Sequence, residues 1–411
     1  MTPGHPIPGL AVSGEDIPST AVINIGMLLT GDVDEPYGEA DSLLVEDGTI
    51  TRLGAVVDGD AERVIDAGGA TVGPGLIDSH CHVVLGDYTP RQRAVGFLEG
   101  YVHGGITSCI SPGEIHLPGR PHDAEGVKAL AVLAQRSWAN YRPNGMKVNG
   151  GAIILEPVLT AEDFREVAGK GVWLAKFGFG LYDDPADGLP QVRDAQAAGI
   201  KVMVHSGGAS IPGSIPITAD HLMLLQPDVC GHVNGGPTSL DDGRLDALVR
   251  ETDLVLQLVQ AGNLRSSLRV VDAVREIGAE HRVILGSDTP TGTGVMPLGV
   301  LKTMAELASL GGVDAGLVWA WASGAVADVY GLEAGKVEVG RPADLVVSDA
   351  PWGSCGSDTV GALARGDVPG ISAVLIDGRV RALRSRNTPA SATAVTVHPP
   401  MEDPCGSEHV C

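Results

Sequence analysis

The chain has 411 residues, of which 44% are hydrophobic and 4% aromatic, and its 51 acidic and 28 basic residues give a net charge of −23. This charge excludes nucleic acid and anionic membranes as favoured partners, and so few aromatics argue against a stacking platform. The six cysteines lack paired spacing, no apolar run reaches the ~20 residues of a membrane helix, and no signal peptide is evident. A cytoplasmic protein with one large and one small domain is predicted.

The N-terminal part of the chain changes character near residue 20. Residues 1–19 are rich in Pro and Gly and predict a mobile arm. Residues 20–72 contain short alternating runs, and the Asp47-Gly48 pair between two of them is typical of a hairpin turn. This region therefore predicts the first part of a small β domain.

The middle of the chain, residues 73–333, has a different rhythm. Short apolar runs such as GLIDSH, KVMVHS and RVILGSD alternate with helical patterns, about eight times. This alternation predicts an α/β fold with a TIM-like (β/α)8 barrel rather than an open sheet. No Gly-x-Gly-x-x-Gly follows the first run, which argues against a dinucleotide-binding fold.

Strand-rich sequence returns in residues 334–386, which have their own Asp377-Gly378 turn. Together with residues 20–72 they predict one β-sandwich domain assembled from both termini. Residues 387–411 are rich in Pro, Ser and Thr and predict a disordered tail. The tail contains four metal-capable side chains whose spacing matches no usual zinc pattern: His398, Cys405, His409 and Cys411.

Potential metal ligands recur at the ends of the apolar runs in the middle region. Active sites of such barrels are built at the carboxyl ends of the strands. Residues i and i+2 of a strand face the same way, so both histidines of the first run can hold one ion. The candidate ligands are His80, His82, Lys176, His205, His232 and Asp288.

Each of these residues also has an ordinary interpretation. A lone His after an apolar run is usually a hydrogen-bonded structural residue, and a lone Asp there is often a helix N-cap. A lone Lys inside an apolar strand is harder to explain, because burying an unpaired ammonium is costly. The order His-x-His, Lys, His, His, Asp, each near a predicted strand end, favours a metal site over these separate explanations.

This order resembles the binuclear branch of the amidohydrolase superfamily. The resemblance implies a site for two divalent transition metals, zinc or a zinc and iron pair. His80, His82 and Asp288 would bind one ion, and His205 and His232 the other. Lys176, carboxylated by CO₂, would bridge both ions together with a hydroxide, and its carboxylation would remove the cost of burying an ammonium.

The chemistry implied by this ligand set is hydrolysis. Two cations lower the pKa of a shared water, and one polarises the scissile carbonyl. Asp288 would be the catalytic base and would later protonate the leaving nitrogen. A deaminase is disfavoured, because such enzymes place a Glu three residues after the third His, where this chain has Gly208.

Longer strings resemble the enamidase subfamily, which opens the lactam 6-oxo-1,4,5,6-tetrahydronicotinate. They are HSGG, GHVNGGPT, GSDTPTGTGVMPLG, GDVPGISAVLIDG and SRNTP, and the similarity runs from about residue 20 to 390. The resemblance implies an amidohydrolase of the EC 3.5.2 type acting on a small cyclic amide, and a homo-oligomer, namely a tetramer. The ligands alone leave open a hydantoinase, an imidase or an isoaspartyl dipeptidase. A non-catalytic relative is disfavoured, because no ligand of the set is missing.

Substrate contacts are expected from loops that follow the strands. If the substrate carries a carboxylate, Arg120 and Arg265 are candidate partners by loop position. The full set of candidate substrate residues is Glu114, His116, Arg120, Asn234 and Thr291.

Overall fold

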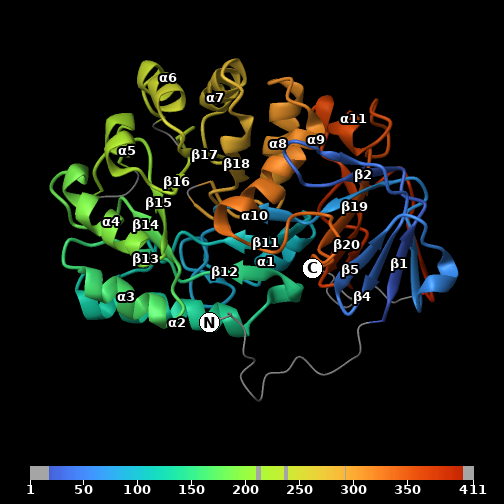
Figure 1. Cartoon of the computed structure of the whole chain (residues 1–411), viewed down its shortest axis with the longest axis horizontal. Coiled ribbons are helices and arrows are strands. Elements are labelled where there is room, and N and C mark those ends of the chain that lie inside the picture. Colours follow the sequence, from blue (N-terminus) through green and yellow to red (C-terminus); the bar gives the residue numbers. More distant parts are fainter. Residues whose placement is uncertain (1–17, 210–213, 236–238, 292, 401–411) are drawn as a thin grey trace.

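The computed structural model describes residues 18–400 except 210–213, 236–238 and 292 (Figure 1). The expected N-terminal arm, residues 1–19, therefore lies outside the described residues apart from its last two. Within the described ranges, no helix combines the length and apolarity needed to cross a membrane.

Parallel strands form the centre of the middle region. One sheet has the order β12-β11-β8 and the other runs in chain order from β13 to β18. The amide of Ser79 donates to the carbonyl of Leu285 at 3.3 Å, so the chain leaving β8 lies beside β18. These strands are β8 (Leu76–Asp78), β11 (Ile106–Ile110), β12 (Lys147–Asn149), β13 (Ile153–Ile154), β14 (Leu174–Phe177), β15 (Lys201–Val204), β16 (Val229–Cys230), β17 (Val255–Val259) and β18 (Val283–Gly286).

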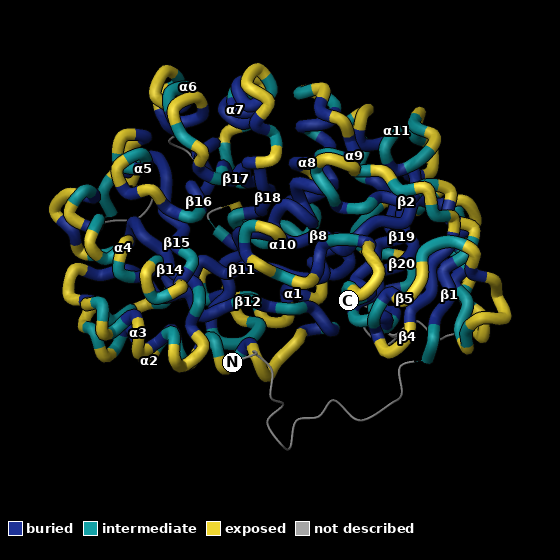
Figure 2. Tube along the Cα trace, viewed as in Figure 1, coloured by how far each residue is buried: buried dark blue, intermediate teal, exposed yellow. Residues whose placement is uncertain are grey.

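Helices lie outside these strands and shield them from solvent, as the yellow outer and dark blue inner segments of Figure 2 show. Because both faces of the strands are covered, their sequences are nearly continuous apolar runs, such as the wholly buried VILG of β18. Side chains of Asp123, Thr160 and Asn263 cap α2, α3 and α7 and fix where these helices begin.

The helices are α1 (Leu98–Val102), α2 (Ala124–Asn140), α3 (Ala161–Gly169), α4 (Leu189–Ala197), α5 (Ala219–Leu225), α6 (Asp242–Glu251), α7 (Leu264–Glu276), α8 (Gly299–Ser309), α9 (Ala315–Trp321), α10 (Gly324–Tyr330) and α11 (Thr359–Ala364). Short 3-10 turns occur at η1 (Asp58–Asp60), η2 (Pro143–Gly145), η3 (Pro185–Gly188) and η4 (Glu280–Arg282). A separate hairpin, β9 (Tyr88–Thr89) and β10 (Ala94–Val95), stands between β8 and α1.

Strands from the two ends of the chain share a sheet. β7 pairs antiparallel with β19, and blue and red strands accordingly lie together in Figure 1. The sheet orders are β22-β6-β1-β4-β5 and β21-β20-β19-β7-β2-β3, and one apolar cluster contains residues of both. The strands are β1 (Thr20–Ile23), β2 (Met27–Leu29), β3 (Tyr37–Gly38), β4 (Leu43–Glu46), β5 (Thr49–Leu53), β6 (Arg63–Asp66), β7 (Thr71–Pro74), β19 (Leu345–Asp349), β20 (Gly370–Ile376), β21 (Arg379–Leu383) and β22 (Thr396–His398).

The prediction of a disordered tail over residues 387–411 is wrong for its first part. β22 pairs antiparallel with β6, with Val397 opposite Ile65. Val395 and Val397 also pack against the apolar cluster of the small sheets. Backbone hydrogen bonds at a sheet edge and these valines outweigh the composition of the segment. Cys405, His409 and Cys411 lie outside the described residues.

A charged network joins the parallel strands to the small sheets. Lys147 of β12 makes ion pairs of 2.7 Å with Asp344 and with Asp377. The side chain of Asp344 is fully buried and accepts a further hydrogen bond from the amide of Asp377 at 2.9 Å. Arg142 pairs with the second oxygen of Asp377 at 2.7 Å. We call Lys147, Asp344, Asp377 and Arg142 the junction network.

Candidate metal centre

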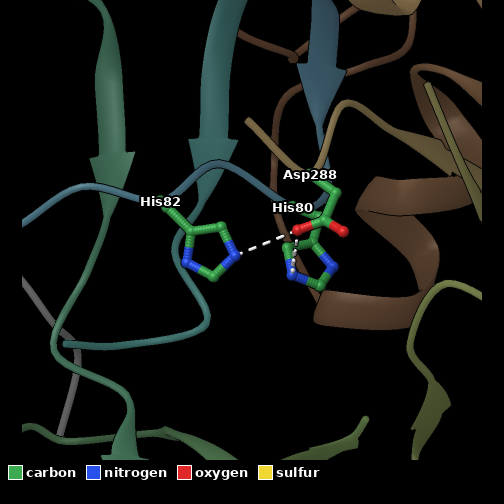
Figure 3. A group of neighbouring side chains, drawn as sticks. All are labelled: His80, His82 and Asp288. Carbon is green, nitrogen blue, oxygen red and sulfur yellow. Dashed lines mark hydrogen bonds and ion pairs between the residues drawn. The ribbon is translucent and has the colours of Figure 1, made fainter. Parts of the chain in front are cut away.

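The His80–Cys81–His82 segment follows β8 and is buried, with His80 1% and His82 6% exposed. The amide of His80 donates to the carboxylate of Asp78 at 3.0 Å, which holds the segment against the strand end. Both imidazoles face the carboxylate of Asp288, as Figure 3 shows. The thiol of Cys81 is also fully buried.

Asp288 comes just after β18 and brings its carboxylate between the two histidines. Its Oδ1 lies 3.0 Å from His82 Nε2 and 3.3 Å from His80 Nε2. Its backbone amide donates to the carbonyl of His80 at 2.8 Å, so the two loops are fastened together. Ligand-capable atoms of all three residues lie within 4.8 Å of one another, so His80, His82 and Asp288 form a candidate metal site.

Two further histidines lie beside this group. His205 follows β15, His232 follows β16, and their ring centroids are 4.5 Å apart. The ring of His232 is also 5.5 Å from that of His80. Gly178 permits the close approach of β14 to this pair, because its φ is +120° and an added Cβ would lie 2.6 Å from the Cβ of His205.

Lys176 of β14 is 1% exposed, and its side chain makes one hydrogen bond within the described residues, from Nζ to the sulfur of Met203 at 3.3 Å. Thioether sulfur is a weak acceptor, so the ammonium is poorly compensated. Burial accordingly lowers the pKa of Lys176 to about 8. Its positive charge in turn contributes to lowering the pKa of His80, His82 and His205.

All four histidines are held as neutral imidazoles. Burial is the main cause: it lowers the pKa of His82 and of His205 to about 3, and it lowers the pKa of His80 and His232 well below the ordinary value. Neutral imidazole is the form that binds metal ions. The Nδ1 atoms of His82, His205 and His232 are buried and have no hydrogen-bond partner in the described part of the chain. Such atoms fit metal ligation, because buried polar groups otherwise find partners.

Two supporting residues escaped the sequence reasoning. Gln257 of β17 is fully buried, and its Oε1 lies 2.7 Å from His80 Nδ1 and accepts from the amide of His232 at 3.1 Å. This contact fixes the ring orientation of His80 and leaves its Nε2 facing Asp288. Asp78 accepts from the amide and hydroxyl of Ser287 and ties the β8 and β18 ends together. The signal for Gln257 was a lone polar residue inside the apolar run LVLQLV.

Among the candidate substrate residues, His116 and Thr291 lie near this group. The ring centroid of His116 is 4.7 Å from that of His82. Thr291 lies three residues after Asp288, and its carbonyl accepts a hydrogen bond from Gln92 at 2.5 Å. Both residues therefore stand where a bound molecule could reach them.

The candidates Arg120 and Glu114 line one small cavity together. Arg120 pairs with Glu156 at 2.9 Å and donates to the carbonyl of Phe179 at 2.8 Å. Glu114 is 2% exposed and lines, with Arg120 and residues of α2, a cavity of about 10 Å³ rather than joining the histidines. Burial raises the pKa of Glu114 well above its usual range.

Asn234 and Arg265 also have structural partners. The Asn234 side chain donates to Val259 and Ser267, both at 2.9 Å, and accepts from the amide of Val259 at 3.1 Å. Arg265 is exposed and makes a bidentate pair with Asp242. Such partners lie on other loops and helices and leave no trace in a local sequence pattern.

The model of the Amidohydrolase family matches residues 71–381. This chain belongs to that family. The match includes every residue of the candidate metal centre, from His80 to Asp288. Amidohydrolases typically bind divalent metal ions, and the His80, His82 and Asp288 group is a candidate site for one.

Among curated amidohydrolases, the chain is 45% identical to the enamidase of Eubacterium barkeri over 382 residues, which are 92% of this chain and 99% of that protein. A crystal structure of enamidase superposes with a TM-score of 0.89 at 45% identity and covers 92% of this chain and 100% of that one. A D-hydantoinase from Thermus sp. superposes with a TM-score of 0.61 at 17% identity, covering 89% and 95%. The last likeness shows the fold alone.

Proposed function

We propose that this chain is an enamidase-like hydrolase that opens the C–N bond of a cyclic amide with water. The observation that carries this proposal is the 45% identity to enamidase over 99% of that protein's length. A hydantoinase is not favoured, since the likeness to one is 17% identity. The site geometry supports a hydrolase, because neutral histidines and a carboxylate converge in a buried position.

The proposal includes two divalent metal ions, zinc or zinc with iron. His80, His82 and Asp288 would hold one ion, and His205 and His232 the other. Lys176, carboxylated, would contact both, which would replace a poorly compensated ammonium by an anion. Nitrogen and oxygen donors of this kind suit zinc, iron(II) and similar ions. When bound, such ions supply Lewis acidity toward a carbonyl and lower the pKa of water.

Asp288 is placed to move protons. Its carboxylate lies beside the histidines, and burial raises its pKa while His232, Lys176 and His116 act in the opposite direction. A carboxylate in this position can take a proton from the attacking water and pass it to the departing nitrogen. Gln257 holds the His80 ring in place during these transfers.

The proposed reaction adds one water across the ring amide. Its oxygen bonds to the carbonyl carbon, the C–N bond breaks, and the nitrogen takes a proton, which leaves a carboxylate and an amine on one open chain. Where the ring nitrogen is also joined to a C=C bond, the open product is an enamine, and a second water converts it to an aldehyde and ammonia.

The architecture proposed with this function is a (β/α)8 barrel and a β-sandwich built from both termini. Hydrogen bonds between the β8 and β18 ends and the β7–β19 pairing support it. A homo-oligomer, tetrameric as the enamidase resemblance implies, and a cytoplasmic location complete the proposal. The buried thiols of Cys81, Cys109 and Cys230, which are free, support a reducing compartment.

The test is product analysis with purified, metal-loaded protein and 6-oxo-1,4,5,6-tetrahydronicotinate. We expect 2-formylglutarate and ammonia in equal amounts, with activity lost after chelation and restored by zinc and iron(II). Dihydrouracil serves as the hydantoinase substrate in parallel. Turnover of dihydrouracil without turnover of the nicotinate lactam would contradict the proposal.

A further inference from the structure

The β9–β10 hairpin lies at the edge of the candidate metal centre. At its tip, Gln92 donates to the carbonyl of Thr291, on the loop that carries Asp288. At its base, the amide of Gly96 donates to the carbonyl of Asp87 at 2.8 Å. The hairpin is thus closed on itself and fastened to the loop after β18, which gives its tip residues a defined position.

Arg91 at this tip is connected to the metal centre through one ring. Its NH1 donates to His116 Nδ1 at 3.3 Å, and the ring of His116 lies 4.7 Å from that of His82. His116 therefore joins the hairpin tip to the metal centre.

A pocket of about 310 Å³ lies between the hairpin and the segment after β11. Its lining is mainly apolar, and Arg91 is its one residue with a permanent charge; the lining residues are Pro90, Arg91, Ile115, His116, Leu117 and Pro118. A pocket with apolar walls and one cation suits a small ring that carries an anionic group.

Arg91 has the capacity for such a ligand. Within the described part of the chain, no carboxylate lies in salt-bridge distance of it, and the contact with His116 uses one of its five N–H donors. Arg120, by contrast, is committed to Glu156, and Arg265 to Asp242. In a chain of net charge −23, an anionic substrate needs such a local cation.

We propose that Arg91 is a specificity-determining residue that binds the carboxylate of a cyclic amide substrate in this pocket. The inference rests on the proposed function and adds the residue that recognises the ring carboxylate and so separates such rings from neutral ones. The ring packs against Ile115, Leu117 and the two prolines, and the carboxylate takes the free edge of the guanidinium. Arginine suits this role because its planar fork matches a carboxylate.

The experiment compares Arg91→Gln with Arg93→Gln on two substrates. Arg93 lies on the same hairpin tip and carries the same charge but does not line the pocket, so it is the matched control. The substrates are 6-oxo-1,4,5,6-tetrahydronicotinate and the corresponding carboxamide. We expect Arg91→Gln to raise KM for the carboxylate about tenfold or more, with kcat nearly unchanged and little effect on the carboxamide. Arg93→Gln should change neither KM by more than about twofold.

A binding measurement keeps this inference separate from the proposed function. Calorimetry with nicotinate and nicotinamide as non-reacting probes needs no turnover. Nicotinate binding that is lost in Arg91→Gln and kept in Arg93→Gln supports the subsite even if neither lactam is hydrolysed, an outcome that would sink only the enamidase-like activity. Equal nicotinate binding by all three proteins, or an equal KM change on both substrates, would overturn the role of Arg91.

Discussion

Two lysines, Lys147 half-buried and Lys176 buried, show how differently a structural and a functional position are built. Lys147 in the junction network makes ion pairs with Asp344 and Asp377, and those carboxylates have further donors. Within the described residues, the ammonium of Lys176, in the parallel strand β14, has only the sulfur of Met203 as a hydrogen-bond partner. The charge of Lys147 is compensated by carboxylates of the protein itself. The ammonium of Lys176 is not, and a metal ion or a carboxylation of the lysine would remove this imbalance.

Several ligand-capable atoms of the metal centre lack partners, although buried atoms elsewhere in the described residues, such as both carboxylate oxygens of Glu114, lack them too. Three histidine Nδ1 atoms lack partners in the described residues, and all three belong to the candidate metal centre. Such groups cost stability in the metal-free fold. The following substitutions test the contrast in both regions.

The largest expected effect is on turnover. Asp288→Asn removes the group that moves the proton while keeping its shape, so we expect kcat to fall by a factor of about 10² to 10⁴. Steady-state kinetics measures this change, and an unchanged circular dichroism spectrum shows that the fold is kept. A variant that retains a third of its kcat would remove Asp288 from the mechanism.

The junction network should respond in stability instead. Asp344→Asn leaves Lys147 with one carboxylate and buries an amide where a charge was matched, so we expect the free energy of unfolding to fall by roughly 3 kcal/mol. Urea denaturation measures this value. Metal content per chain should stay as in the wild type, and a loss of metal would show that the two regions are not independent.

Lys176→Met should raise stability, in contrast to Asp344→Asn. Burial lowers the pKa of Lys176 to about 8 from 10.5, so its charge costs stability at pH 7 in the metal-free protein. We expect Met to raise the free energy of unfolding of that form by roughly 1–3 kcal/mol, while turnover and the second metal are lost.

The pH dependence of the wild-type protein's stability tests whether the charge of Lys176 is destabilising. Between pH 8 and 10.5 the unfolded chain binds the proton that the folded chain has lost, so the lysine's contribution makes the metal-free protein more stable as pH rises. Lys176→Met should lack this rise. A variant less stable than the wild type at pH 7 would mean that Lys176 is better compensated than its contacts indicate.

The smallest expected effect concerns the support of His80. Gln257→Met keeps the volume of the side chain but removes the acceptor for His80 Nδ1 and for the amide of His232. We expect metal affinity to fall about tenfold, as is usual for residues that orient metal ligands. Competition with a chelator of known affinity measures this change, and unaltered affinity would make Gln257 a packing residue only.

The sequence predicted the meeting of His80, His82 and Asp288 because strand ends gather at one edge and each residue follows an apolar run. It could not reveal that Arg120 and Asn234 are engaged by distant partners, since Glu156, Val259 and Ser267 lie on other elements. It also missed β22, because pairing with β6 depends on a sheet edge rather than on composition. Arg91 escaped notice as one arginine in a short hairpin.

The β9–β10 hairpin has a consequence for how such an enzyme changes its substrate. It forms a two-stranded sheet of its own, apart from the sheets that hold the metal ligands. Arg91 can therefore be exchanged, by evolution or by an engineer, while Gln92 keeps its hydrogen bond to the loop that carries Asp288. Exchanging Arg91 for an acidic or apolar residue would redirect the same chemistry to cationic or neutral rings, which makes this hairpin a selectivity module.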